Sequence, residues 1–333
     1  MDFVFAPEAD DAAQLAATIL ADHTSVERQR EVEAGGDRFD RTLWEALNRA
    51  FDWDDLDLIA LCRVLVEAGR RVAPVPLAVH GPVRMLLAEN GVEASGLLTA
   101  AVAEERSQLP ASPTVTADGD RLTGTKTLVR AGMAADAFVV TTDTGVFLVD
   151  ANASGVRREA QHTSDRDVTA LVTFDGAPGI RVGDAATATR LAQLLTVAEC
   201  AELLGVTEGA LHLTADYAKT REQFGRPIGT FQAVAQRLAD GFIDVLCQRL
   251  TLWQAAWRLS EGLDATSEVA IAKLWAADAA HRLAHTAVHV HGGVGIDLDG
   301  ETHRYFSTAK RFEFALGSST EQALALGQQL AAR

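Results

Sequence analysis

Cysteine is scarce in this chain, and its three copies lie far apart. Cys62, Cys200 and Cys247, among 333 residues, fit neither a disulfide framework nor the spacing of metal ligands. We therefore interpret all three as buried thiols. Long hydrophobic runs are also missing, since no apolar stretch approaches the roughly 20 residues that a membrane-spanning helix requires. The first residues lack the basic start and long apolar core of a signal peptide, so we expect a cytoplasmic protein without membrane contacts.

Positive charge is in short supply as well. Lys and Arg number 30 against 46 Asp and Glu, which gives a formal net charge of −16. Nucleic-acid binding depends on Lys and Arg that neutralise phosphates, so we expect no nucleic-acid partner. An acidic surface can still hold an anionic cofactor where a few arginines and helix N-termini converge. Apolar residues, by contrast, make up 48% of the chain, which is enough for two or three packed units.

The hydrophobic pattern predicts helices at both ends of the chain and strands in the middle. Residues 1–96 are expected to form a helical domain, because segments 11–20 and 56–66 repeat apolar residues at i, i+3 and i+4. Pro74 and Pro76 then interrupt the pattern before a further helix over 83–89.

Residues 97–183 are expected to form a middle β domain, because short β-prone runs alternate there with Asp, Gly and Asn turn residues. Residues 184–333 become helical again and are interpreted as a four-helix bundle. The predicted fold class is therefore α+β. The predicted strands lie near 114–116, 137–140, 145–149 and 170–174, and the later helices at 191–221, 231–262, 267–291 and 320–332.

The segment from Tyr217 to Gln232, YAKTREQFGRPIGTFQ, combines residues suited to holding a dinucleotide. Arg221 lies at a predicted helix end, and its guanidinium offers a rigid fork of donors for a pyrophosphate. Phe224 supplies an apolar face for an adenine, and Gly225 permits a tight turn. Gln232 can both donate and accept hydrogen bonds at the start of the next helix.

A second segment, HVHGGVG from His289 to Gly295, follows a predicted helix. Gly292 and Gly293 remove two Cβ atoms, so backbone amides there can approach a phosphate or ribose closely. His289 also belongs to an i, i+4, i+8 series with His281 and His285, which would line one helix face. Because no carboxylate or cysteine spacing completes a ligand shell, we predict no metal site.

Together the two segments resemble the signature motifs of the acyl-CoA dehydrogenase family. The first is similar to the family's helix-loop-helix segment, and the second to its Gln-x-x-Gly-Gly-x-Gly, with His289 in place of Gln. The resemblance implies the family's order of α domain, β domain and helical bundle, and a flavin adenine dinucleotide (FAD) whose ADP half is held by the neighbouring subunit. The cofactor-binding residues that it implies are Arg221, Phe224, Gln232, His289, Gly292, Gly293 and Gly295.

Two departures from the family pattern concern catalysis. Leu316 stands where the family usually has its glutamate base, and Leu195 stands at the position used in a branch that resembles isovaleryl-CoA dehydrogenase. The middle domain keeps the family's Gly-Thr-Lys strand but has Leu128 in place of a flavin-contacting Trp, and it lacks a Gly-Ser-Asp loop.

These departures lead to the hypothesis of a catalytically inactive β subunit in a heteromeric α2β2 acyl-CoA dehydrogenase, similar to those of bacterial steroid catabolism. The resemblance implies an acyl-CoA substrate, a catalytic partner subunit, and electron-transferring flavoprotein as the electron acceptor. One alternative is a self-sufficient homomeric dehydrogenase with an unusual base, for which Glu199 or Glu202 is the candidate. Another is a flavin-free scaffold in which Arg221 and Gln232 are structural remnants.

Overall fold

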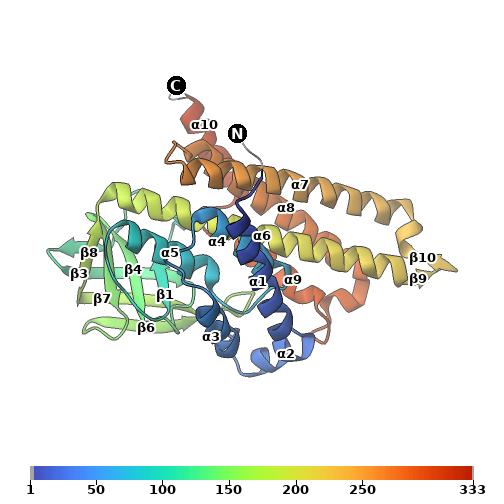
Figure 1. The fold of residues 1–333 in the computed structure, drawn as a ribbon, viewed down its shortest axis with the longest axis horizontal. Helices are drawn as coiled ribbons and strands as arrows, with labels where there is room; N and C mark the ends of the chain where they lie inside the picture. The colour runs from blue at the N-terminus through green and yellow to red at the C-terminus, as the bar shows by residue number, and fades with distance from the viewer. Residues whose placement is uncertain (1–3, 332–333) are drawn as a thin grey trace. The chain divides into compact units, whose positions relative to one another are not determined.

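A computed structural model describes residues 4–331 as a combination of helices and strands (Figure 1). Its contacts divide the chain into two compact units, each built from separate stretches of sequence. The first, here called the helical unit, comprises residues up to Glu31, Leu58–Ala73 and the chain from Glu199 onward. The second, called the sheet unit, comprises Val32–Asp57 and Pro74–Ala198. The division into three domains over residues 1–96, 97–183 and 184–333, which the sequence led us to expect, remains a proposal.

Helix α8 (Thr266–His291) lies at the centre of the helical unit, where it contacts α7, α9 and α10. Most of its buried positions hold alanine, so neighbouring helices approach it from several sides. Helix α4 contacts both α1 and α7. The other elements of this unit are α1 (Pro7–His23), α4 (Leu58–Arg70), α6 (Ala185–Thr220) from Glu199 onward, α7 (Gln232–Ser260), α9 (Thr302–Phe312), α10 (Ser319–Ala331), and the 3₁₀ turns η1 (Ile228–Thr230) and η2 (Gly292–Ile296).

Glycines bring α4 and α6 into backbone contact. A Cβ atom added at Gly69 would lie 1.9 Å from the carbonyl oxygen of Glu202, and one added at Gly205 would lie 2.1 Å from that of Val66. No real side chain tolerates such distances, so glycine is required at both positions. The crossing therefore fixes α6 against α4 about three helical turns before the segment that begins at Tyr217.

The sheet unit contains two four-stranded sheets, with strand orders β1-β4-β5-β8 and β2-β3-β7-β6. Strand β1 runs parallel to β4, and the other neighbouring strands are antiparallel. The strands are β1 (Leu98–Ala101), β2 (Thr116–Asp118), β3 (Arg121–Val129), β4 (Ala137–Thr142), β5 (Gly145–Asp150), β6 (Val156–Gln161), β7 (Thr169–Pro178) and β8 (Ile180–Gly183), and the helices α3 (Arg41–Ala50) and α5 (Leu77–Glu89) precede them. Helix α2 (Val26–Ala34) contributes residues to both units.

Apolar side chains from both sheets form one core in this unit. Phe138 of β4 and Phe147 of β5 are fully buried, as is Phe174 of β7 in the other sheet. The rings of Phe138 and Phe174 meet edge to face with their centroids 6.4 Å apart. The two sheets therefore share one apolar core.

The predicted α+β class and its order of helices, strands and C-terminal helices are confirmed. Three local expectations need correction. Helix α5 begins at Leu77 and contains Pro82, although the helix was expected only from residue 83. The first predicted run after residue 113 pairs only from Thr116, and α9 was not anticipated. Cys62 and Cys200 are buried as expected, whereas Cys247 is partly exposed.

Candidate functional site

A short hairpin lies between the end of α6 and the start of α7 (Figure 1). Strands β9 (Glu222–Gln223) and β10 (Arg226–Pro227) pair in antiparallel register, with Arg226 opposite Gln223. Phe224 and Gly225 connect them with φ values of 54° and 76°, the combination that defines a type I′ turn. Phe224 is 93% exposed and adopts a left-handed backbone that aromatic residues rarely take. A strained, solvent-facing aromatic at a loop tip indicates a contact with another molecule.

Arg221 lies directly after the last residue of α6. Its N–H donates to the carbonyl of Tyr217, and its own carbonyl accepts from the N–H of Ile228, both at 2.8 Å. The backbone of this residue is therefore fixed by bonds on both sides. Its side chain is exposed and makes no salt bridge within the described residues, so the guanidinium is available for an anion.

The start of α7 faces the same loop. Phe231 is the N-cap residue of α7, and no side chain caps the helix there. Gln232, the first helical residue, is exposed. An uncapped helix start presents unsatisfied backbone N–H groups and a partial positive charge, both of which favour a bound anion.

The second motif forms the end of α8. Gly292 has a φ of 65° and terminates the helix, and a Cβ atom at Gly292 or Gly293 would meet no other atom within 4 Å. Space is therefore open above these two backbones. Gly295 differs, because its Cβ would lie 3.0 Å from the carbonyl oxygen of Val288, so packing inside the chain explains it. His289 is exposed one turn earlier.

Tyr217 and His291 bring the two motifs together. Their rings stack with centroids 4.3 Å apart and an angle of 22° between the planes. His291 is 9% exposed, and its Nδ1 lies 2.8 Å from the carbonyl oxygen of Ala287, so Nδ1 carries the hydrogen. Burial lowers the pKa of His291 and so favours the neutral form of the ring. The sequence did not reveal this pairing, although each motif contains one of the two rings.

Neither expected base position offers a proton acceptor. Leu195 is buried in α6. Leu316 is half-buried with a left-handed φ of 53°, and its carbonyl accepts a hydrogen bond from the Gln322 side chain. Both positions are occupied by alkyl side chains, which cannot remove a proton.

The two alternative carboxylates lie inside the helical unit. Glu199 is bound to Lys273, whose Nζ lies 2.7 Å from Glu199 Oε1 and 2.6 Å from the carbonyl oxygen of Phe312. Lys273 is fully buried, so this is an interior ion pair between α6 and α8. Glu202 is only 5% exposed. Neither carboxylate is presented at the surface of the chain.

A bulge occupies the place of the Trp that the family resemblance implied. The pairing of β3 with β7 shifts between Lys126 and Val129, and Leu128 takes a left-handed φ of 52°. Gln161 satisfies this bulge, because its Oε1 accepts the N–H of Leu128 at 2.7 Å and its Nε2 donates to Thr127 Oγ1. The backbone N–H of Leu128 therefore already has a hydrogen-bond acceptor within the chain.

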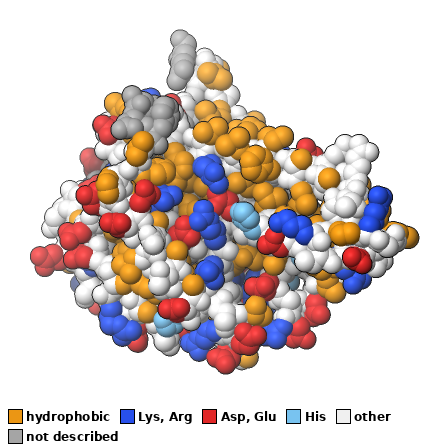
Figure 2. Space-filling view, turned by 45° about the vertical axis from the view of Figure 1, so that its right-hand side comes forward, with side chains coloured by type: hydrophobic (Ala, Val, Ile, Leu, Met, Phe, Trp, Pro, Cys, Tyr) orange, Lys and Arg blue, Asp and Glu red, His pale blue; other side chains and the backbone are white. Residues whose placement is uncertain are grey.

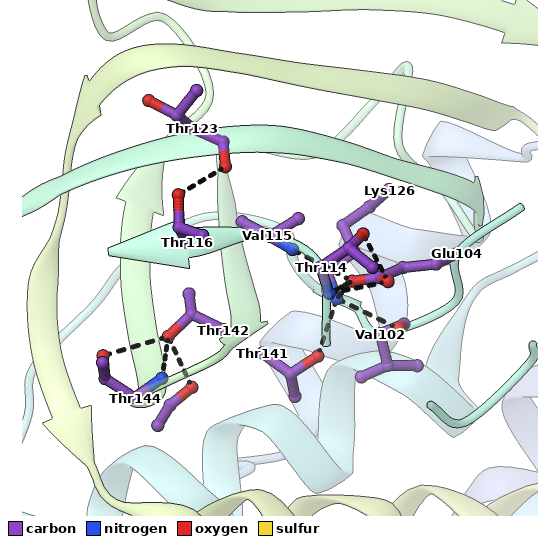
Figure 3. A network of polar contacts seen from close by, with 11 residues as sticks. Val102, Glu104, Thr114, Val115, Thr116, Thr123, Lys126, Thr141, Thr142 and Thr144 are labelled. Carbon is purple, nitrogen blue, oxygen red and sulfur yellow. Dashed lines mark hydrogen bonds and ion pairs between the residues drawn. The ribbon is translucent and has the colours of Figure 1, made fainter. Parts of the chain in front are cut away.

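A buried ion pair supports the same strand (Figure 3). Lys126 is fully buried, with its Nζ 2.7 Å from Glu104 Oε1 and 3.0 Å from Thr141 Oγ1. Glu104 also accepts the N–H groups of Thr114 and Val115. Burial alone would raise the pKa of Glu104, but the hydrogen bonds from Lys126 and Thr114 lower it below its usual value. The charged groups of Lys126 and Glu104 form their hydrogen bonds with residues of this chain, so the ion pair has a structural role.

Among residues 4–331 no group of three His, Cys, Asp or Glu side chains is placed to hold a metal ion. His281 Nδ1 instead lies 3.0 Å from Glu313 Oε1. None of the helices within these residues is long and apolar enough to span a bilayer.

Helix α7 carries an exposed apolar stripe, made of Phe242, Ile243, Leu246 and Leu250. These four side chains are 43–65% exposed, and their spacing of three and four residues places them on one face of the helix. Figure 2 shows hydrophobic side chains gathered over a broad area of one face of the molecule. Large contiguous apolar surface is typical of a protein–protein interface.

Comparisons with known proteins cover the whole chain. Residues 188–331 match the family described as "Acyl-CoA dehydrogenase, C-terminal domain". The chain is 42% identical to "Acyl-CoA dehydrogenase FadE27" of Mycobacterium tuberculosis, over 99% of both proteins. Among solved structures, a chain of the ChsE4-ChsE5 complex from Mycobacterium tuberculosis matches with 40% identity and a TM-score of 0.89 over 100% of both chains. A chain of the Tcur3481-Tcur3483 steroid ACAD matches with 36% identity and a TM-score of 0.93 over 98% of both chains.

Proposed function

Since the chain belongs to the acyl-CoA dehydrogenase family, we propose that it is the cofactor-sharing subunit of a heteromeric, FAD-dependent acyl-CoA dehydrogenase. The observation that carries the proposal is a contrast within one chain. The hairpin after α6 presents Arg221 and Phe224 to solvent, whereas the two positions for a base hold Leu195 and Leu316. Within the described residues the chain keeps the groups that it would give to a neighbour's cofactor, while neither expected base position carries a carboxylate.

The exposed groups fit the ADP half of FAD. Arg221 would bind the pyrophosphate with its fork of donors, and Phe224 would lie against the adenine side. Gln232 and the uncapped start of α7 would add neutral donors, and His289, Gly292 and Gly293 would form the second part of the same site. Gly295, which the resemblance also implied, would support this part from within, because it packs against Val288. FAD held there would supply the acceptor for the β-hydrogen of the substrate, which leaves as a hydride.

Removal of the α-proton requires a carboxylate, and none of the candidate positions within residues 4–331 presents one. Leu195 and Leu316 are apolar, and Glu199 is neutralised by Lys273 inside the helical unit. Leu128 and the bulge that Gln161 satisfies take the place of a flavin-contacting side chain. We therefore assign the base and the reactive flavin ring to a catalytic partner subunit, and we expect this chain alone to be inactive.

The apolar stripe on α7 and two of the similar solved structures support a second, different subunit as partner. A stripe of four large hydrophobic side chains is costly to leave in water, so a second chain is expected to cover it. Two similar solved structures are named as pairs of different proteins. We propose an α2β2 assembly with a catalytic acyl-CoA dehydrogenase subunit, an acyl-CoA substrate that is steroid-derived, and electron-transferring flavoprotein as the acceptor.

Co-expression with the catalytic partner tests this function. We expect the purified complex to contain FAD and to dehydrogenate an acyl-CoA, and the lone chain to do neither. Arg221→Ala in this chain should remove FAD from the complex without dissociating it. If the Arg221→Ala complex retains FAD, the result favours the alternative in which this chain is a scaffold that makes no contact with the flavin. Flavin binding and turnover by the lone chain would favour the homomeric enzyme, for which loss of turnover in Glu202→Gln would identify the base.

A further inference from the structure

The two arginines of the hairpin lie on one face of its ribbon. Arg226 is paired with Gln223, and Pro227 with Glu222. The bond from the N–H of Ile228 to the carbonyl of Arg221 continues this ladder by one residue. Because side chains alternate along a strand and paired residues share a face, Arg221, Gln223 and Arg226 fall on one side of the ribbon. Glu222 and Pro227 fall on the other side.

Arg226 is held by an aromatic ring. Its guanidinium lies 4.3 Å from the centroid of the Phe231 ring, within the range of a cation–π contact. Phe224 meets the same Phe231 ring edge to face at 6.1 Å. The side chain of Arg226 is exposed and makes no salt bridge within the part of the chain that the structure describes. A ring orients the guanidinium without neutralising it, so its charge and its donors remain available.

The ring that holds Arg226 belongs to the N-cap residue of α7. The guanidinium therefore lies close to an uncapped helix start, which itself favours negative charge. Arg221 on the same face of the ribbon is a diagonal neighbour, a relationship that places the two residues about 7–8 Å apart, with their Cβ atoms somewhat closer. The acidic residue of the hairpin, Glu222, points to the opposite face and does not compete.

We propose that Arg226 is a second pyrophosphate-binding guanidinium of the shared FAD site, positioned by Phe231 and acting beside Arg221. The inference rests on the proposed function, because it concerns the same cofactor. The pyrophosphate of FAD carries two negative charges, and a single guanidinium leaves one of them without a cationic partner. Two guanidinium groups on one face neutralise both, which explains how a chain of net charge −16 holds an anionic dinucleotide.

The test is the affinity of the assembled apo-complex for FAD, measured by the change in flavin absorbance during titration. Arg226→Ala should weaken binding about tenfold or more, since a charge-assisted hydrogen bond is lost. Arg226→Lys keeps the charge without the fork and should give an intermediate loss. Glu222→Gln is the matched control on the opposite face of the ribbon and should leave the affinity unchanged.

Salt dependence separates a charge contact from a merely structural role. If Arg226 meets the pyrophosphate, the FAD affinity of the Arg226→Ala complex should fall less steeply with added NaCl than that of wild type. Arg226→Gln, which keeps part of the alkyl stem over Phe231, should share the weakened binding even if Arg226→Ala disturbs the hairpin. An unchanged FAD affinity in Arg226→Gln, or an equal salt dependence in all variants, overturns the proposal.

Arg221→Ala distinguishes this inference from the function on which it rests. Loss of FAD in Arg221→Ala with wild-type affinity in Arg226→Ala refutes the role of Arg226 and leaves the shared site standing. Wild-type affinity in both variants refutes the shared site as well. Weakened binding in both, with Glu222→Gln unchanged, is the result we expect.

Discussion

Tyr217 stacks on His291 at 4.3 Å and thereby joins the two cofactor motifs within one chain. The N–H of Arg221 bonds to the carbonyl of Tyr217, and Gly292 follows His291 directly. Both halves of the proposed site therefore extend from one aromatic contact. We interpret Tyr217 and His291 as positioning residues that hold the arginine and the glycines in a common frame.

Loss of this stack should affect both stability and cofactor binding. Tyr217→Ala should lower the free energy of unfolding by about 1 kcal/mol through the lost ring pair, and should weaken FAD binding severalfold in the complex. Tyr217→Phe keeps the ring and should behave as wild type in both urea denaturation and FAD titration. A Tyr217→Ala complex with wild-type FAD affinity would show that the stack does not position the motifs.

Removal of one partner of the buried Lys273–Glu199 pair should destabilise the fold more than replacement of both partners. Glu199→Gln leaves the fully buried Lys273 ammonium without its counter-ion, and we expect a loss of about 3–5 kcal/mol in the free energy of unfolding. The double variant Glu199→Leu with Lys273→Met should recover most of that loss. Lys219→Met, which breaks an exposed pair with Asp216, is the control and should leave the urea midpoint unchanged. Equal losses in the single and double variants would contradict a coupled interior pair.

Substitution of Gly293 should weaken FAD binding without affecting the stability of the fold. A Cβ atom at this position meets nothing within the chain, so Gly293→Ala should leave the unfolding midpoint of the lone chain close to wild type. In the complex the same methyl group would enter the space above the backbone and should weaken FAD binding severalfold. Gly327→Ala, in an equally open position on α10, is the control and should not change FAD affinity. An unaffected Gly293→Ala complex would remove this glycine from the site.

His80 should make the sheet unit sensitive to acid. Burial, reinforced by the nearby charge of Arg84, lowers the pKa of His80 to about 3, while its Nδ1 accepts the N–H of Leu98. Below pH 6.5 the unfolded chain takes up a proton that the folded chain excludes, so stability falls as pH falls from about 6.5 towards 3. This group contributes a slope of about 1.4 kcal/mol per pH unit. Urea unfolding at pH 7.5 and pH 5 should show a smaller pH effect in His80→Asn than in wild type, and equal effects would refute the assignment.

Periodicity and turn chemistry predicted much of the fold. The i, i+3, i+4 pattern gave α1, α4 and the long C-terminal helices, because each buries one apolar face. It missed α9, whose sequence between Thr302 and Phe312 is polar apart from a few positions. It also placed the start of α5 too late: the helix was expected from residue 83, after the interruption at Pro74 and Pro76, whereas it begins at Leu77 and accommodates Pro82.

The candidate site was predictable only in part. Arg221, Phe224 and Gly292 are found by motif, since glycine and arginine spacing is local information. The contacts that hold them are not local. The Tyr217–His291 stack and the Glu199–Lys273 pair join α6 to α8, and the sequence gives no register between two helices so far apart in the chain. The Arg226–Phe231 contact likewise depends on the turn at Phe224. Phe224 adopts a left-handed backbone there, which the sequence does not predict for an aromatic residue.

The most direct test of the whole account is the FAD content of the complex when the catalytic partner is co-expressed with wild-type or Arg221→Ala chain. Visible absorbance per mole of intact complex, with the lone chain measured in parallel, gives the answer. We predict a flavin-loaded wild-type complex, a flavin-depleted Arg221→Ala complex of the same mass, and a colourless lone chain. A lone chain that binds FAD and oxidises an acyl-CoA, or an Arg221→Ala complex that keeps its full flavin, would contradict the claim.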